Sequence, residues 1–109
     1  MKLNLIFSLA AFYLLLGGCK KAEKPIIDEK KMVDVLVDIH LIEASLLGFP
    51  DNQKDSLSPI YYRQIYEIHS ISEDSFLTEM NFLKHHPEYM EHIYKLVLEE
   101  IDRREAEFK

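Results

Sequence analysis

Residues 28–47 read DEKKMVDVLVDIHLIEASLL, and this stretch decides the fold class. It contains no glycine or proline, and its apolar side chains cover a wide arc of a helix instead of alternating as in a strand. Asp28 is a favourable N-cap residue. Ile27 and Met32 stand on either side of it at the spacing of a hydrophobic staple. A helix is therefore predicted to begin near Glu29, and we expect it to be the most buried helix of the protein.

Three further helices are predicted along the chain. Residues 48–55 (GFPDNQKD) are turn formers and predict a loop. Ser58 and Pro59 then form a typical helix start, with serine as N-cap and proline at the first helical position, where its missing N–H does no harm. Ser72 is the expected N-cap of a third helix. Pro87 is expected to end that helix and to open the fourth.

Length and patterning indicate one domain. At 109 residues the chain is too short for two independent cores. Persistent alternation of apolar and polar residues is missing, which argues against strands. We predict an all-α fold, a small bundle of about four helices over residues 26–109. Within the first helix, Asp34, Asp38 and Ser45 share a stripe that we expect to face solvent.

The charge balance disfavours nucleic acid as a partner. The formal net charge is -6, and most lysines and arginines have acidic neighbours in the sequence. Binding to a phosphate backbone requires clustered basic side chains. We therefore expect no nucleic-acid partner.

The N-terminal segment has the pattern of a secretory signal peptide. Lys2 gives a short positive end, and residues 3–16 are mostly apolar. A permanent membrane helix needs about 20 apolar residues, so this stretch is short for one. Residues 1–18 are predicted to be a cleaved signal peptide, and the alternative is an uncleaved single-span anchor.

The motif Leu16-Gly17-Gly18-Cys19 resembles the lipobox of bacterial lipoproteins. The resemblance implies cleavage between Gly18 and Cys19 and acylation of Cys19 by several fatty chains, of the palmitate type. Cys19 is also the only cysteine, so it cannot form a disulfide within the monomer. One fatty chain binds a membrane reversibly, whereas two or more hold it firmly. The sequence therefore predicts that the protein is attached to a membrane through this lipid anchor.

Residues 19–25 comprise the lipidated cysteine and a short polar leash. By resemblance to bacterial lipoproteins, an aspartate after the cysteine often signals retention in the inner membrane. The residue here is Lys20, so we expect attachment to the outer membrane of the cell envelope. The helical domain would face either the periplasm or the cell surface.

The helical part resembles a family of small Gram-negative lipoproteins with a domain of unknown function, of the 4296 type. The matching positions are mostly helix-core and capping positions spread over residues 25–101. They include Lys31-Met32-Val33, Asp38-Ile39-His40-Leu41, Glu43-Ala44, Tyr62…Ile65-Tyr66…His69 and Pro87-Glu88…Ile93-Tyr94. The resemblance implies an envelope address and no assigned activity, and hence no catalytic residues to transfer to this chain.

His40 and Glu43 are the strongest candidates for chemistry. Three residues apart on a helix, they could present their side chains to one ion or share a proton. A metal site normally needs three or four protein ligands, and the commoner role of such a histidine is a hydrogen bond across the bundle. No glycine-flanked serine or second cysteine offers a nucleophile. We therefore predict no metal, no cofactor and no catalytic residue.

The tyrosines are the remaining candidates for binding. Tyr61, Tyr62 and Tyr66 could line a groove for a peptide or glycan, although a tyrosine row at helical spacing more often fills a core. The leading hypothesis is a membrane-anchored, non-catalytic domain that binds another envelope component, a protein more readily than a small molecule. The alternatives are a metal-dependent or acid–base envelope enzyme centred on His40 and Glu43, and a periplasmic chaperone-like protein or structural spacer.

Overall fold

The computed structural model describes residues 2, 4, 6 and 24–108, and it confirms the all-α fold. Residues 24–108 contain no strand. They form four helices: α2 (Glu29–Leu46), α3 (Asp51–Ile68), α4 (Glu73–His85) and α5 (Pro87–Glu107). None of the helices in the described part of the chain is long and apolar enough to cross a membrane.

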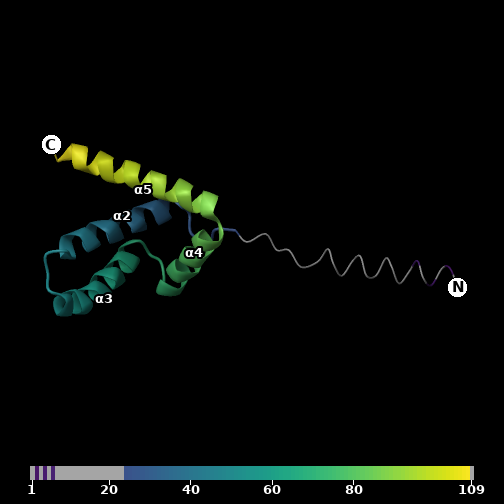
Figure 1. Cartoon of the computed structure of the whole chain (residues 1–109), viewed down its shortest axis with the longest axis horizontal. Helices are drawn as coiled ribbons and strands as arrows, with labels where there is room; N and C mark the ends of the chain where they lie inside the picture. The colour runs from purple at the N-terminus through teal and green to yellow at the C-terminus, as the bar shows by residue number, and fades with distance from the viewer. Residues whose placement is uncertain (1, 3, 5, 7–23, 109) are drawn as a thin grey trace.

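Helix α2 is the centre of the bundle. It packs against α5 on one side and against α3 on the other, and α4 packs against α5 (Figure 1). The segment that leads into α2, α4 and the start of α5 lie at one end of the bundle, whereas the α2–α3 connection lies at the other (Figure 1). The two ends of the bundle are therefore built from different elements.

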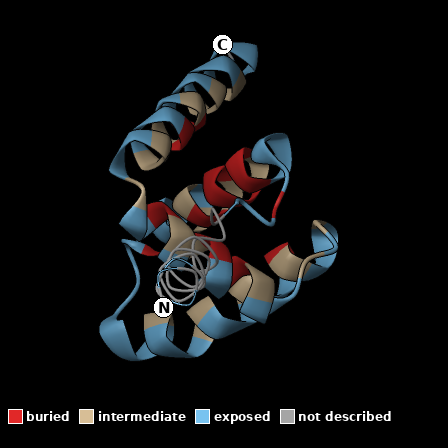
Figure 2. Cartoon of the chain, turned by 90° about the vertical axis from the view of Figure 1, so that its right-hand side faces the viewer, coloured by how far each residue is buried: buried red, intermediate tan, exposed pale blue. Residues whose placement is uncertain are grey.

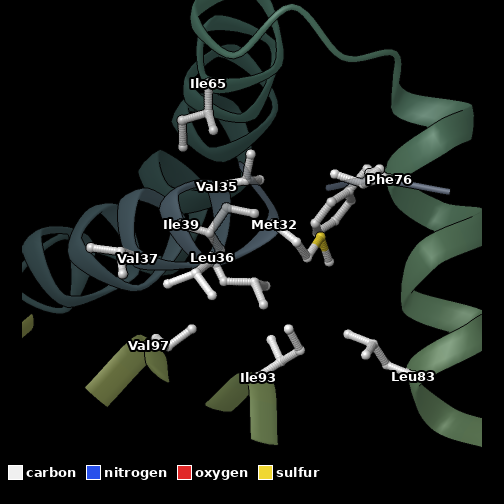
Figure 3. Close-up of a cluster of buried hydrophobic side chains, with 12 residues drawn as sticks. Met32, Val35, Leu36, Val37, Ile39, Ile65, Phe76, Leu83, Ile93 and Val97 are labelled. Carbon is white, nitrogen blue, oxygen red and sulfur yellow. The ribbon is translucent and has the colours of Figure 1, made fainter. Parts of the chain in front are cut away.

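The core is formed around α2, which carries more buried side chains than any other helix in residues 24–108 (Figure 2). Val35 and Val37 are completely buried. Figure 3 shows Ile65 of α3, Phe76 and Leu83 of α4, and Ile93 and Val97 of α5 converging on this helix. The prediction that the first helix is the most buried is confirmed, and the reason is that it contacts helices on two sides.

Most predicted helix boundaries are confirmed by their caps. The Asp28 carboxylate accepts a hydrogen bond from the backbone N–H of Lys31 at 3.4 Å at the start of α2. The Ser72 hydroxyl accepts one from the N–H of Ser75 at 3.0 Å at the start of α4. Helix α4 ends at His85 and Pro87 begins α5, because proline disfavours helical geometry in the residue before it.

The predicted start of the second helix is wrong. Helix α3 begins at Asp51, so residues 51–55 are helical and Pro59 lies inside the helix. The Pro50 carbonyl accepts hydrogen bonds from the N–H groups of Gln53 (2.9 Å) and Lys54 (3.0 Å), so the N-cap is Pro50, eight residues before the predicted N-cap Ser58. Pro59 removes one backbone donor, and the flanking turns and the packing of Ile65 keep the helix continuous.

Helix α3 ends in a Schellman motif whose left-handed residue is a serine. The N–H of Ile71 bonds to the carbonyl of Tyr66 at 3.0 Å, and the N–H of Ser70 bonds to that of Glu67 at 3.2 Å. Ser70 has a φ of 55°, a conformation that favours glycine. The side chain therefore carries a conformational cost at this position.

Replacing Ser70 by glycine should raise the free energy of unfolding by about 0.5 to 1 kcal/mol, because glycine adopts the left-handed conformation without the steric cost of a Cβ atom. For a domain of this size the melting temperature should rise by roughly 2 to 8 °C. Thermal denaturation followed by circular dichroism measures the change. Ser70→Ala is the matched control and should give no gain, and equal stability of the two variants would contradict the prediction.

Candidate functional site

A hollow lies beside α3, next to the α3–α4 connection. It has a volume of about 490 Å³ and is lined by residues that include Pro59, Tyr62, Arg63, Tyr66, Ile71 and Glu73. We call it the tyrosine groove. Two of the three predicted tyrosines are thus brought together, at positions four residues apart on one helix face.

Contacts with neighbouring side chains on the core side hold the rings of Tyr62 and Tyr66 in place. The ring of Tyr66 packs against that of Phe76, with centroids 5.3 Å apart. The hydroxyl of Tyr62 donates a hydrogen bond to Oε1 of Glu43 on α2 at 2.8 Å. Both tyrosines are partly buried and pack against the core. Little side-chain entropy remains to be lost when a ligand covers them.

These surroundings also set the ionisation of the two phenols. Burial, together with the hydrogen bond to Glu43, raises the pKa of Tyr62 to about 12. Burial and the nearby charge of Glu73 raise the pKa of Tyr66 above its ordinary value. At neutral pH both side chains are therefore neutral hydrogen-bond donors, which suits binding better than proton abstraction.

Tyr61 lies outside the tyrosine groove. It lines a separate pocket of about 380 Å³ between α2 and α3, together with Leu41, Ile65 and Ile68. Tyr61 directly precedes Tyr62 and is rotated by about 100° around the helix axis. The three tyrosines therefore do not form one surface, and the candidate binding surface reduces to Tyr62 and Tyr66.

His40 and Glu43 are neighbours, with 3.8 Å between Nδ1 and Oε2. Glu43 is engaged by the hydroxyl of Tyr62, and the His40 ring meets the ring of Tyr94 edge-on at 5.9 Å between centroids. In residues 24–108 no three His, Cys, Asp or Glu side chains are grouped so that they could hold a metal ion. The pair links α2 to α3 and α5 by side-chain contacts.

A second polar cluster joins α2, the end of α3 and α5, and the sequence did not reveal it. Asp38 contacts His69 through Oδ2 and Nε2 at 2.6 Å and accepts a hydrogen bond from Nη1 of Arg104 at 3.1 Å. Arg104 also lies 3.7 Å from Asp34 and 2.9 Å from Glu100. The predicted solvent stripe is therefore wrong at Asp34 and Asp38, which are partly covered because α5 packs over them.

Glu79 of α4 is another residue that the sequence analysis did not single out. Its side chain is fully buried, and Oε2 accepts hydrogen bonds from the backbone N–H groups of Ile26 (2.8 Å) and Ile27 (3.1 Å). Its other oxygen has no hydrogen-bond partner in the described part of the chain. Glu79 shares a helical stripe with Phe76 and Leu83, and this position among buried residues was a signal in the sequence.

The predicted lipidation site lies outside the described residues. Gly18 and Cys19 belong to residues 7–23, for which the structure gives no placement. Cleavage and acylation therefore remain predictions from the sequence. The leash is described only from residue 24 onward, where Lys24 and Ile26 line a small pocket against α4.

The fold and the groove define a small helical-bundle protein with an aromatic hollow on one side. Residues 24–107 match the family described as "Domain of unknown function (DUF4296)". The chain belongs to this family, which confirms the resemblance carried by the helix-core positions. No match is found among curated proteins or among solved structures.

The raised pKa values of Tyr62 and Tyr66 predict that part of the protein's stability is lost at high pH. A phenol whose pKa is higher in the folded than in the unfolded state contributes stability that is complete below about pH 10 and is lost as the pH rises through the folded pKa. For Tyr62 the loss should fall between about pH 10 and 12. Glu43→Gln should lower the Tyr62 pKa partway, because burial remains while the acceptor charge is removed.

Spectrophotometric titration of the phenols measures this shift. One phenol should ionise at lower pH in Glu43→Gln than in the parent protein. Glu91→Gln, an exposed change on α5, is the control and should leave the titration unchanged. If both variants titrate like the parent, the contact between Tyr62 and Glu43 does not exist in solution.

Proposed function

We propose that this protein is a membrane-anchored lipoprotein whose helical body binds another component of the cell envelope through the tyrosine groove. The observation that carries the binding role is the pair of aromatic rings, Tyr62 and Tyr66, held from behind by Glu43 and Phe76. Preorganised rings provide a large contact area at low entropic cost.

The lining of the groove favours a peptide as the bound group. Arg63 and Glu73 supply charges of both signs beside the rings, and Ile71 adds an apolar contact. A peptide segment can satisfy such a mixture with its backbone amides and alternate side chains. We therefore infer that the partner is an envelope protein that presents a peptide segment.

The anchor rests on the sequence. Leu16-Gly17-Gly18-Cys19 follows an apolar stretch of signal-peptide length, and Lys20 favours the outer membrane. Cys19→Ala should shift the protein from the membrane fraction to the soluble envelope fraction, because fatty chains would no longer hold it. Intact-mass measurement of the mature protein is the direct check, and retention of residues 1–18 with a free thiol would disprove this part.

The proposal assigns no catalytic role to His40 and Glu43. Support comes from the way in which Glu43 is engaged by Tyr62 and His40 by Tyr94, which explains both residues by packing. Elemental analysis of the purified protein tests the rival proposal of a metal enzyme. Stoichiometric metal that is lost in His40→Ala would favour the rival.

Site-specific photocrosslinking in intact cells tests the groove. A photoreactive phenylalanine analogue at Arg63, on the groove wall, should give an adduct with an envelope protein. The same analogue at Lys95, an exposed position on α5, is the control and should not give that adduct. The adduct should weaken in Tyr62→Ala, and identical adducts from both positions would argue against the groove as the binding site.

A further inference from the structure

We propose that the exposed face of α4 rests on the lipid surface of the membrane. This face consists of Leu77, Thr78, Asn81 and Lys84, together with Ile26, which lines a pocket with Thr78 and Asn81, and we call it the α4 face. The inference rests on the proposed acylation of Cys19, and it adds to that proposal by specifying how the body sits on the bilayer.

The leash between the proposed anchor and the helical body is short. The hydrogen bonds from the N–H groups of Ile26 and Ile27 to Glu79 fix the start of the body to α4. Only residues 19–25 then separate the proposed anchor from this point, and seven residues span at most about 25 Å. That distance is about the length of α2. An anchored body therefore stays close to the lipid surface.

The leash leaves the helical body next to α4. Lys24 and Ile26 line a pocket of about 230 Å³ against Thr78, Asn81 and Phe82 of α4. In Figure 1, the segment that leads into α2 lies at the α4 end of the bundle, and the α2–α3 connection lies at the opposite end. The elements nearest the membrane should therefore be α4 and the start of α5.

The α4 face combines exposed apolar side chains with lysines. Ile26 is 59% exposed and Leu77 is 55% exposed, although neither contributes to the core. Lys84 lies in the last turn of α4 and Lys24 lines the pocket, while one exposed carboxylate, that of Asp74, lies at the first-turn end of the same face. Apolar side chains flanked by lysines are typical of surfaces that lie in the lipid headgroup region.

Fluorescence quenching by lipids tests the proposal on the intact, acylated protein. Once Cys19 carries its fatty chains, an introduced cysteine is the only free thiol available for a fluorophore. The protein would be reconstituted in vesicles of phosphatidylethanolamine and phosphatidylglycerol that contain a headgroup-labelled nitroxide lipid. One label goes on Leu77→Cys, and the control label goes on Leu47→Cys, which is 75% exposed in the α2–α3 connection.

The label on Leu77→Cys should be quenched severalfold more strongly by the nitroxide lipid than the label on Leu47→Cys. Adding Lys84→Glu should weaken the quenching on these anionic vesicles. Leu77 and Lys84 are both exposed, and circular dichroism verifies that the variants at these positions retain their helices.

The contrary results are distinguishable. Equal quenching at the two positions in an acylated protein would overturn the inference and leave the anchor intact. Protection of the Leu77→Cys label that grows with protein concentration, without lipid quenching, would show a second copy on this face and would also overturn it. A free thiol at Cys19 in the intact mass would overturn both the inference and the proposed anchor.

Discussion

Replacing Glu79 by alanine should lower the free energy of unfolding by about 3 kcal/mol. The carboxylate is fully buried and accepts two backbone hydrogen bonds, from Ile26 and Ile27. A hydrogen bond contributes roughly 0.5 to 1.5 kcal/mol, and a buried N–H group left without an acceptor costs roughly 1 to 3 kcal/mol. A domain of this size has a total stability of roughly 4 to 13 kcal/mol, so the loss is large.

Urea denaturation followed by circular dichroism, in the Cys19→Ala background, measures the effect. Glu79→Gln is the matched control, because its carbonyl oxygen can still accept both hydrogen bonds. It should lose only about 1 kcal/mol or less, because both hydrogen bonds to the backbone N–H groups remain. A Glu79→Ala protein within about 0.5 kcal/mol of the parent would show that the contact contributes no net stability.

Replacing Asp38 by alanine should cost about 2 kcal/mol. Asp38 contacts His69 at 2.6 Å and accepts a hydrogen bond from Arg104 at 3.1 Å, and all three side chains are less than one-third exposed. Each contact joins α2 to another helix or its end, so the substitution loosens the packing of α3 and α5 on α2. Arg104 keeps its contact with Glu100, which limits the loss.

Asp34→Ala is the control for this cluster. Asp34 is also on α2, but its distance to Arg104 is 3.7 Å, and we expect a loss of less than about 1 kcal/mol. A double-mutant cycle between Asp38→Ala and His69→Ala should give a coupling of about 1 kcal/mol. Equal losses for Asp34→Ala and Asp38→Ala, or additive effects in the cycle, would contradict the role given to Asp38.

Much of the fold could be predicted because local signals decide it. Asp28, Ser72 and Pro87 act within a few residues of their own positions, so their roles can be inferred from neighbouring residues alone. The start of α3 was mispredicted for the same reason. Ser58-Pro59 is a strong local signal, but Pro50 offers an earlier start, and the packing of α3 against α2 maintains the helix across the proline.

The candidate site was only partly predictable from the sequence. Residue type alone points to Tyr61, Tyr62 and Tyr66 together, and only the structure separates Tyr61 from the other two. The contacts of Asp38 with His69 and Arg104 join residues 31 and 66 positions apart. Helical periodicity places a residue on a face of its own helix but does not say which helix covers that face.

If Cys19 carries the proposed lipid anchor, the attachment of Ile26 and Ile27 to Glu79 is the first contact that a mechanical load on that anchor would meet. A pull on the leash reaches the two hydrogen bonds at α4 before it reaches the first turn of α2. Their rupture, together with withdrawal of the buried Ile27 side chain from the core, would release two residues and lengthen the tether by about 7 Å. Under such a load we expect this attachment to break before helix α2 unfolds.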